Sequence, residues 1–299
     1  MQPPAKGRAV ESADRTIALP SGGALHVAGA SGATPLLLLH GVGGGAWSWR
    51  PQRAELAATC RLFVWEARGH GAAARVGDAG LADYYVDARE ALVLAVADAG
   101  TPVHVVGHSM GGLLAMSLAC DDPVRVRSLF LIDPVYATES AGGHLPPSLA
   151  GVAAVVCAPL LRSIARNGTL GRAVMRSVFA RAFENRERML LAWADQRRQV
   201  PVEYPRMLRE SFSGPTGFRV HDFAREIGCP TYLLEGSARG GARFPALIAA
   251  LRERLRADFV HDAIRGGHYL QLDRPSAVNG RIEAFVGAGR ALATEPRPA

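Results

Sequence analysis

The sequence contains very little lysine and cysteine. Lys6 is the only lysine among its 299 residues, so almost all of its positive charge comes from arginine. The four cysteines, Cys60, Cys120, Cys157 and Cys229, form no Cys-x-x-Cys pair and no cluster with histidine at metal-ligand spacing. We therefore expect no structural metal and no disulfide framework. We expect these cysteines to be small, buried, apolar side chains of a protein in a reducing compartment.

Long apolar runs are also missing. No stretch of about 18 apolar residues predicts a membrane span, and the polar residues 1–14 lack the apolar core of a signal peptide. The formal net charge is +7, but no nucleic-acid-binding motif accompanies the basic residues. These absences predict a soluble cytoplasmic protein that acts on a small molecule, without a nucleic-acid or membrane partner. The sequence leaves the oligomeric state open.

One stretch organises the rest of the chain. The β-branched run Val103–Val106 leads into Gly-His-Ser-Met-Gly, and the apolar run Leu113–Ala119 after it is typical of a buried helix. Strand, Gly-x-Ser-x-Gly and helix in this order indicate a nucleophile elbow, which exposes Ser109 at a sharp turn before a helix N-terminus. The alternative is a glycine-rich turn with an incidental serine.

A second glycine-rich loop follows the apolar strand Leu36–Leu39. Acyl transfer needs two donors aimed at the developing oxyanion. We predict the N–H of Met110 as one donor and the N–H of Val42 as the other, with Gly43 as the alternative to Val42. Gly41 and Gly43 are expected to line the substrate site. A turn that only caps a buried strand is the competing interpretation.

These motifs resemble those of the α/β-hydrolase superfamily, from about Thr16 to Gly289. The segment 66–71, Glu-Ala-Arg-Gly-His-Gly, is similar to the family's Asp-x-Arg-Gly-x-Gly. Gly267-His268, followed by Asp273-Arg274-Pro275, is similar to its Gly-His…Glu-x-Pro. The resemblance implies an α/β fold with a mostly parallel sheet, helices on both faces and a helical cap inserted after strand six. It implies no metal or organic cofactor.

Hydrophobic periodicity and turn residues place the elements and domain boundaries. Strands are predicted at 16–19, 24–30, 36–39, 61–65, 103–106, 126–132, 229–236 and 259–264, and helices at 47–58, 81–99, 113–121, 246–256 and 275–288. The expected domains are a core of 15–136 and 221–290, a cap of 137–220, and disordered tails at 1–14 and 291–299.

The predicted cap consists of helical segments near 148–166, 170–183, 184–199 and 203–212. It carries most of the excess positive charge, which we interpret as a solvated outer face. The aromatic residues of its inner face are expected to pack within the cap. Trp193 is the one for which we expect substrate contact.

A serine hydroxyl needs a base within hydrogen-bond reach and an acid behind that base. His268 fits the base, since it follows the last predicted strand on a Gly-Gly loop. The other histidines lie in no comparable context; by the resemblance, His40 and His108 have structural roles at strand ends.

The acid departs from the family pattern. Most relatives carry Asp after strand seven, in Gly-x-x-Asp, but here the matching stretch is Gly236-Ser237-Ala238-Arg239. We predict that Asp133, at the end of strand six, supplies the carboxylate. This position resembles that in haloalkane dehalogenases and fungal zearalenone lactonases. Glu235 is the alternative acid, and Asp133 as a simple turn-capping residue is the competing interpretation.

The resulting prediction is a serine hydrolase that cleaves carboxylic esters or lactones of medium size and hydrophobic character through an acyl-enzyme. A serine at the elbow excludes the alkyl-enzyme ester of haloalkane dehalogenases and epoxide hydrolases, which need a carboxylate there. Two alternatives stay open. One is hydrolysis of a C–C bond in a ring-cleavage product by the same residues, and the other is a small-molecule receptor with little turnover, which Arg239 in place of the acid favours.

Overall fold

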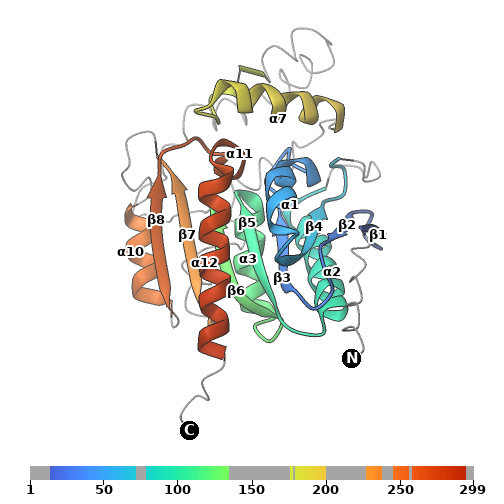
Figure 1. Ribbon diagram of the computed structural model, residues 1–299, viewed down its shortest axis with the longest axis vertical. Coiled ribbons are helices and arrows are strands. Elements are labelled where there is room, and N and C mark those ends of the chain that lie inside the picture. Colours follow the sequence, from blue (N-terminus) through green and yellow to red (C-terminus); the bar gives the residue numbers. More distant parts are fainter. Residues whose placement is uncertain are drawn as a thin grey trace, which may run out of the picture.

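The protein is described here from a computed structural model that covers residues 14–71, 79–134, 176–177, 179–199, 227–237, 245–255 and 258–293. These residues form an eight-stranded sheet in the order β1-β2-β4-β3-β5-β6-β7-β8 (Figure 1). The strands are β1 Arg15–Ala18, β2 Ala24–Ala28, β3 Thr34–Leu39, β4 Cys60–Glu66, β5 Val103–His108, β6 Val126–Ile132, β7 Thr231–Gly236 and β8 Phe259–Ile264. The β1–β2 and β2–β4 pairs are antiparallel, and every later pair is parallel.

Helices cover both faces of this sheet, as the sequence predicts for alternating strands and helices. The described residues form the 3-10 helix η1 Ala46–Trp49 and the α-helices α1 Arg50–Leu56, α2 Leu81–Ala99, α3 Met110–Asp121, α7 Arg186–Gln199, α10 Pro245–Arg254, α11 Leu270–Asp273 and α12 Pro275–Ala293, of which α7 lies beyond the end of the sheet. Together with the sheet order, this arrangement is the α/β-hydrolase fold.

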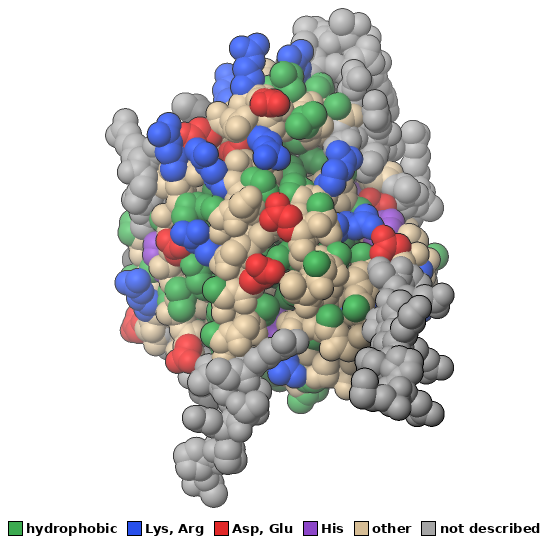
Figure 2. Space-filling model, in the orientation of Figure 1, with side chains coloured by type: hydrophobic (Ala, Val, Ile, Leu, Met, Phe, Trp, Pro, Cys, Tyr) green, Lys and Arg blue, Asp and Glu red, His purple; other side chains and the backbone are tan. Residues whose placement is uncertain are grey.

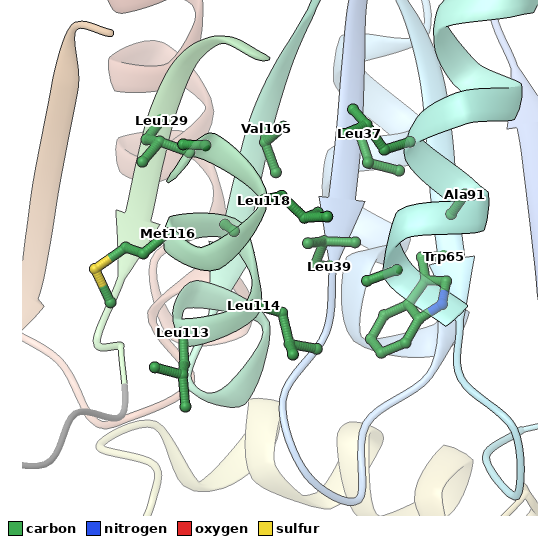
Figure 3. Close-up of a cluster of buried hydrophobic side chains, with 14 of the residues drawn as sticks. Leu37, Leu39, Trp65, Ala91, Val105, Leu113, Leu114, Met116, Leu118 and Leu129 are labelled. Atoms are coloured by element: carbon green, nitrogen blue, oxygen red, sulfur yellow. The ribbon is translucent and has the colours of Figure 1, made fainter. Parts of the chain in front are cut away.

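Alternating residues of the central strands separate two cores. In β3, Leu37 and Leu39 pack with α2, α3 and α10, whereas Leu36 and Leu38 pack with α1 and α12. Figure 3 shows the first of these cores, in which Leu114 and Leu118 of α3 meet side chains from the strands. All six residues of β3 are buried, as expected of a parallel strand that is covered on both faces.

Several predicted elements differ from the structure at their boundaries. The single helix expected at 47–58 is split into η1 and α1, because Pro51 has no N–H for a continuous helix and is favoured in the first turn of a new one. Helix α11 was not predicted, since four residues are too few to show a helical period. Helix α12 runs to Ala293 rather than Ala288, into the segment expected to be a tail. The predicted stop of α2 at Gly100 is confirmed by its left-handed φ of 66°.

Part of the predicted cap lies within the described residues. Helix α7 lies at the end of the molecule near α11 in Figure 1, and it contacts η1 and α11. The tails at 1–13 and 294–299, the cap segments near 148–166 and 203–212, and Arg239 lie outside the described residues. The boundaries of the cap therefore stay a prediction. In the ranges that the structure covers, no helix is both long and apolar enough to cross a membrane.

Candidate active site

Ser109 occupies a strained turn between β5 and α3. Its backbone has φ 54° and ψ −119°, a left-handed conformation that is rare for a residue with a side chain. The turn is possible because its neighbours are glycines. A Cβ on Gly107 would lie 2.4 Å from the carbonyl oxygen of Gly111, and a Cβ on Gly111 would lie 2.1 Å from that of Leu39. The predicted strand–serine–helix arrangement is therefore present, with Ser109 directly before the N-terminus of α3.

The loop after β3 lies against this turn. A Cβ on Gly41 would come within 2.8 Å of the Cβ of Ser109 and 3.0 Å of His108 Nδ1. Met110 is the first residue of α3, where backbone N–H groups have no partner within the helix. In the described part of the chain, no hydrogen bond uses the N–H of Met110 or of Val42. The N–H of Gly43, in contrast, donates to His70 Nε2 at 3.3 Å. Of the two predicted alternatives, Val42 is therefore the one with an available donor.

Hydrogen bonds join this loop to the segment 66–71. In two of them an N–H before or at the start of η1 donates to a side chain of the segment 66–71, and in one an N–H of this segment donates to a side chain of the loop. They are Gly43 N–H to His70 Nε2 at 3.3 Å, Ala46 N–H to Glu66 Oε1 at 3.1 Å, and Ala67 N–H to His40 Nε2 at 3.1 Å. The two motifs noted separately in the sequence thus hold each other in place.

The histidines in this network act as neutral acceptors. Burial lowers the pKa of His40 to about 4 and the pKa of His70 to about 3. Each accepts a backbone N–H at Nε2, and its Nδ1 lies beside a carbonyl oxygen, Gly41 O at 2.8 Å for His40 and Arg68 O at 3.1 Å for His70. A carbonyl can only accept, so Nδ1 carries the proton in both rings. Protonation at Nε2 would remove the acceptor and break the network.

The predicted base and acid are hydrogen-bonded to each other. His268 Nδ1 lies 2.9 Å from Asp133 Oδ2. The other oxygen of this carboxylate, Oδ1, accepts the N–H of Gly236 at 3.0 Å, and the Asp133 side chain is 1% exposed. Because an ionised carboxylate only accepts, the proton of the His268 ring is on Nδ1 and its Nε2 carries the lone pair. No hydrogen bond to this Nε2 is made within the described residues.

His268 is also hydrogen-bonded to His108, the residue before Ser109. His108 Nε2 donates to the carbonyl oxygen of His268 at 2.9 Å, and the two ring centroids are 4.8 Å apart. Burial, with a smaller contribution from His268, holds the pKa of His108 well below its usual range. The loop after β8 is therefore attached beside Ser109 by a neutral histidine.

Glu235, the alternative acid, has a different partner. Its Oε2 lies 2.9 Å from Nε2 of His261, which belongs to the adjacent strand β8. The structure thus places Asp133, and not Glu235, at the His268 ring.

Trp193 lies in an aromatic cluster that joins α7 to the core. Its ring centroid is 5.8 Å from that of Phe179, and Phe183 stacks on Tyr269, the neighbour of His268, at 5.0 Å. The cluster contains Trp47, Phe179, Phe183, Met189, Ala192, Tyr269 and Leu272. The cap aromatics pack on one another, as Phe179 does on Phe183 and Trp193, and they also pack on Trp47 and Tyr269 of the core. Contact between Trp193 and a substrate stays a prediction.

A pocket of about 510 Å³ opens on the cap side of this cluster. Its described lining consists of Ala180, Phe183 and Met189, the polar Ser177, the carboxylate of Glu184, and Arg176 and Arg186. Ser109, Asp133 and His268 are not among these lining residues. In Figure 2, several arginine side chains lie at the same end of the molecule, around α7. No group of three or more His, Cys, Asp or Glu in the described ranges is placed to hold a metal.

Sequence reasoning gave no role to three residues that contact the site loops. Glu66 and His70 hold the loop after β3, and Asp273 accepts the N–H of Gly267, beside His268, at 2.8 Å. All three lie in motifs that carry the family resemblance. The signal was present, but spacing along the chain does not tell which backbone group a side chain meets.

The profile of the alpha/beta hydrolase family matches residues 36–281. The chain belongs to the alpha/beta hydrolase family. Among solved structures, a thermophilic esterase from Thermogutta terrifontis has a TM-score of 0.70 at 20% identity, covering 93% of this chain and 99% of that chain. The enol-lactonase from Burkholderia xenovorans LB400 has a TM-score of 0.67 at 20% identity, covering 91% and 100%. At this identity the structures show the shared fold alone.

Curated relatives match this chain over a shorter stretch. The putative carbamate hydrolase RutD of Azorhizobium caulinodans is 40% identical over 102 residues, 33% of this chain and 37% of that protein. The 2-hydroxymuconate semialdehyde hydrolase of Pseudomonas sp. strain CF600 is 37% identical over 116 residues, 36% of this chain and 38% of that protein. The chain thus matches little more than a third of the length of these relatives.

The buried neutral histidines predict a loss of stability in mild acid. His40, His70 and His108 have folded pKa values below the unfolded value of 6.5, so the unfolded chain binds more protons in that window. Their contribution is complete above pH 6.5 and is lost as the pH falls through the folded pKa values, about 4 for His40 and about 3 for His70. Each lowers the free energy of unfolding by about 1.4 kcal/mol per pH unit. Urea unfolding at pH 7.5, 6.5, 5.5 and 5.0 measures this slope.

His70→Gln serves as the comparison, because the amide oxygen of glutamine can still accept the Gly43 N–H but does not titrate. The free energy of unfolding of this variant should change less steeply with pH than that of the wild type, by the contribution of one histidine. Equal stability of the wild type at pH 7.5 and pH 5.0 would contradict the assignment.

Proposed function

We propose that this member of the alpha/beta hydrolase family is a serine hydrolase that cleaves carboxylic esters or lactones through an acyl-enzyme. The observation that carries the proposal is the hydrogen bond of 2.9 Å between His268 Nδ1 and Asp133 Oδ2. It leaves the Nε2 lone pair of His268 for a proton from Ser109, the residue at the strained turn. A nucleophile, a base and an orienting acid in this relation are the requirement for serine catalysis.

In this mechanism His268 acts first as a base, then as an acid and again as a base. Ser109 Oγ attacks the carbonyl carbon while His268 Nε2 takes the hydroxyl proton. The N–H groups of Met110 and Val42 stabilise the oxyanion of the tetrahedral intermediate. Collapse of this intermediate forms the acyl-enzyme, and His268 gives its proton to the leaving alcohol. A water molecule, deprotonated by His268, releases the acid and restores Ser109. For a lactone, the leaving alcohol stays attached to the acyl group.

The aromatic cluster beside Tyr269 supports an apolar substrate of medium size. Phe179, Phe183 and Trp193 bring apolar surface from the cap to the neighbour of His268. The sequence reason for a receptor without turnover was the missing acid at Arg239. With a carboxylate from Asp133 at His268, that reason no longer favours a receptor over an enzyme.

Two conservative substitutions test the assignment of the acid. Asp133→Asn keeps the shape but takes away the charge that stabilises protonated His268, so we expect kcat to fall by about 10³- to 10⁴-fold on p-nitrophenyl acetate. Glu235→Gln changes a buried carboxylate of the next strand that pairs with His261, and it should leave kcat within about threefold. Ser109→Ala should abolish turnover, and circular dichroism checks the fold of each variant.

The opposite pattern, with Glu235→Gln inactive and Asp133→Asn near wild type, would remove Asp133 from the mechanism.

Hydrolysis of a C–C bond is a second candidate. It is supported by the 37% identity over 116 residues with the 2-hydroxymuconate semialdehyde hydrolase and by the pocket that Arg176 and Arg186 line. The substrates of such enzymes are dienoic acids, whose carboxylate these arginines could pair with. The same serine, base and oxyanion donors would act on a ketone carbonyl.

A substrate panel separates these candidates. We expect the highest kcat/KM for apolar lactones and for aryl or medium-chain esters, and little turnover of dienoic acids, followed by absorbance or pH-stat. If the dienoic acids are preferred, Arg176→Gln should raise their KM and leave the KM of neutral esters unchanged. Good turnover of linear esters with none of the lactones would restrict the activity to esters.

A further inference from the structure

Asp273 is a buried carboxylate outside the catalytic triad. It is the last residue of α11 and is 4% exposed. Its two oxygens accept three backbone N–H groups from two separate segments. These are Gly267 N–H to Oδ2 at 2.8 Å, Glu184 N–H to Oδ2 at 2.8 Å, and Asn185 N–H to Oδ1 at 3.2 Å. One side chain thus satisfies donors that would otherwise be buried without a partner or exposed to solvent.

The two segments belong to different parts of the proposed enzyme. Gly267 directly precedes the base His268. Glu184 and Asn185 directly precede α7, and Asn185 caps that helix, since its Oδ1 accepts the N–H of Arg188 at 3.1 Å. A carboxylate at this position also complements the positive end of the α7 dipole.

The surrounding contacts leave little freedom between the two segments. The N–H of Tyr269 donates to the carbonyl oxygen of Ala182 at 3.2 Å. A Cβ on Gly267 would lie 2.3 Å from the same oxygen. Phe183 stacks on Tyr269 with an angle of 10° between the rings. The backbone around His268 and the backbone before α7 are therefore in direct contact.

We propose that Asp273 is a positioning residue that fixes the base loop and the N-terminus of α7 as one unit. Through Gly267 it holds the backbone of His268, and through Glu184 and Asn185 it holds the helix that carries Trp193. Displacement of α7 then displaces the base. This inference rests on the proposed function for its catalytic consequence, whereas the coupling between the two segments does not depend on it.

A residue that positions His268 and a residue that only anchors the cap differ in which kinetic constants they affect for a short and a long ester. p-Nitrophenyl acetate is too small to need a wall at α7, and p-nitrophenyl octanoate is long enough to use one. A residue that only anchors the cap affects KM for the octanoate. A residue that positions His268 lowers kcat for both esters, because the base must lie in reach of Ser109 whatever the acyl chain.

The test compares Asp273→Ala and Asp273→Asn with the wild type. We expect kcat of Asp273→Ala to fall about 10- to 100-fold on both esters, normalised to active sites by the burst of p-nitrophenol. Asp273→Asn keeps one carbonyl oxygen as an acceptor, so its kcat should lie between those of the wild type and Asp273→Ala. Hydrogen–deuterium exchange should rise together at the amides of Glu184, Asn185 and Gly267.

Two matched carboxylates serve as controls. Asp262→Asn alters a carboxylate on β8 that accepts hydrogen bonds from Tyr232 and Arg281, and it should leave activity and these amides unchanged. Glu184→Gln removes the surface ion pairs with Arg265 and Arg274 but keeps the Asp273 contacts. Its effect should be much smaller than that of Asp273→Ala.

Three results would overturn the proposal. One is a loss confined to the octanoate, another is faster exchange at Gly267 without a change at Glu184 and Asn185, and the third is an equal effect of Glu184→Gln. If Asp273→Ala does not fold, the activity and exchange of Asp273→Asn decide. If the wild type hydrolyses no ester, the proposed function fails, and the exchange experiment alone still decides whether Asp273 joins the two segments.

Discussion

At Ser109 the chain turns from a strand into a helix with a backbone φ of 54°, and most of the site follows from this constraint. Such a turn brings backbone segments very close together, Gly107 to Gly111 and Gly111 to Leu39. Only residues without a Cβ fit at these two positions. Gly111 in turn requires β3 and β5 to be neighbours, as they are in the sheet. The loop after β3 then passes close to Ser109, where a Cβ on Gly41 would lie 2.8 Å from the Cβ of Ser109. A side chain at any of these glycines would push Ser109 away from the loop after β3.

Two buried carboxylates hold the base loop from different sides. Asp133 contacts the His268 ring, and Asp273 contacts the backbone just before it. Asp133 itself has a left-handed φ of 43°, and Gly236 at the end of β7 fixes its second oxygen. The family's usual acid would start from that same strand end. The end of β7 therefore donates a hydrogen bond to Asp133, the residue that directly follows β6.

The sequence predicted those elements that are defined by their own apolar runs and by the turn residues beside them. The elbow strand, its helix and β6 each combine a strong apolar run with clear flanking residues, and all three are present. The loss of the acid after Gly236 directed attention to Asp133. Predictions were weaker where the partner of a side chain is distant along the chain. His70 meets Gly43, and Asp273 meets Glu184, through tertiary contacts that no spacing encodes. The break at η1 and the short α11 likewise depend on packing against α7 and on Pro51, more than on helical periodicity.

The most direct test of a Ser109 nucleophile is reaction with a fluorophosphonate probe, followed by peptide mass spectrometry. This reagent forms a stable adduct with a serine that an adjacent base activates. The account predicts one adduct per chain, on the peptide containing Ser109, and none in Ser109→Ala. Correctly folded wild type that stays unlabelled, or that is labelled at another residue, would contradict the assignment of Ser109 as the nucleophile.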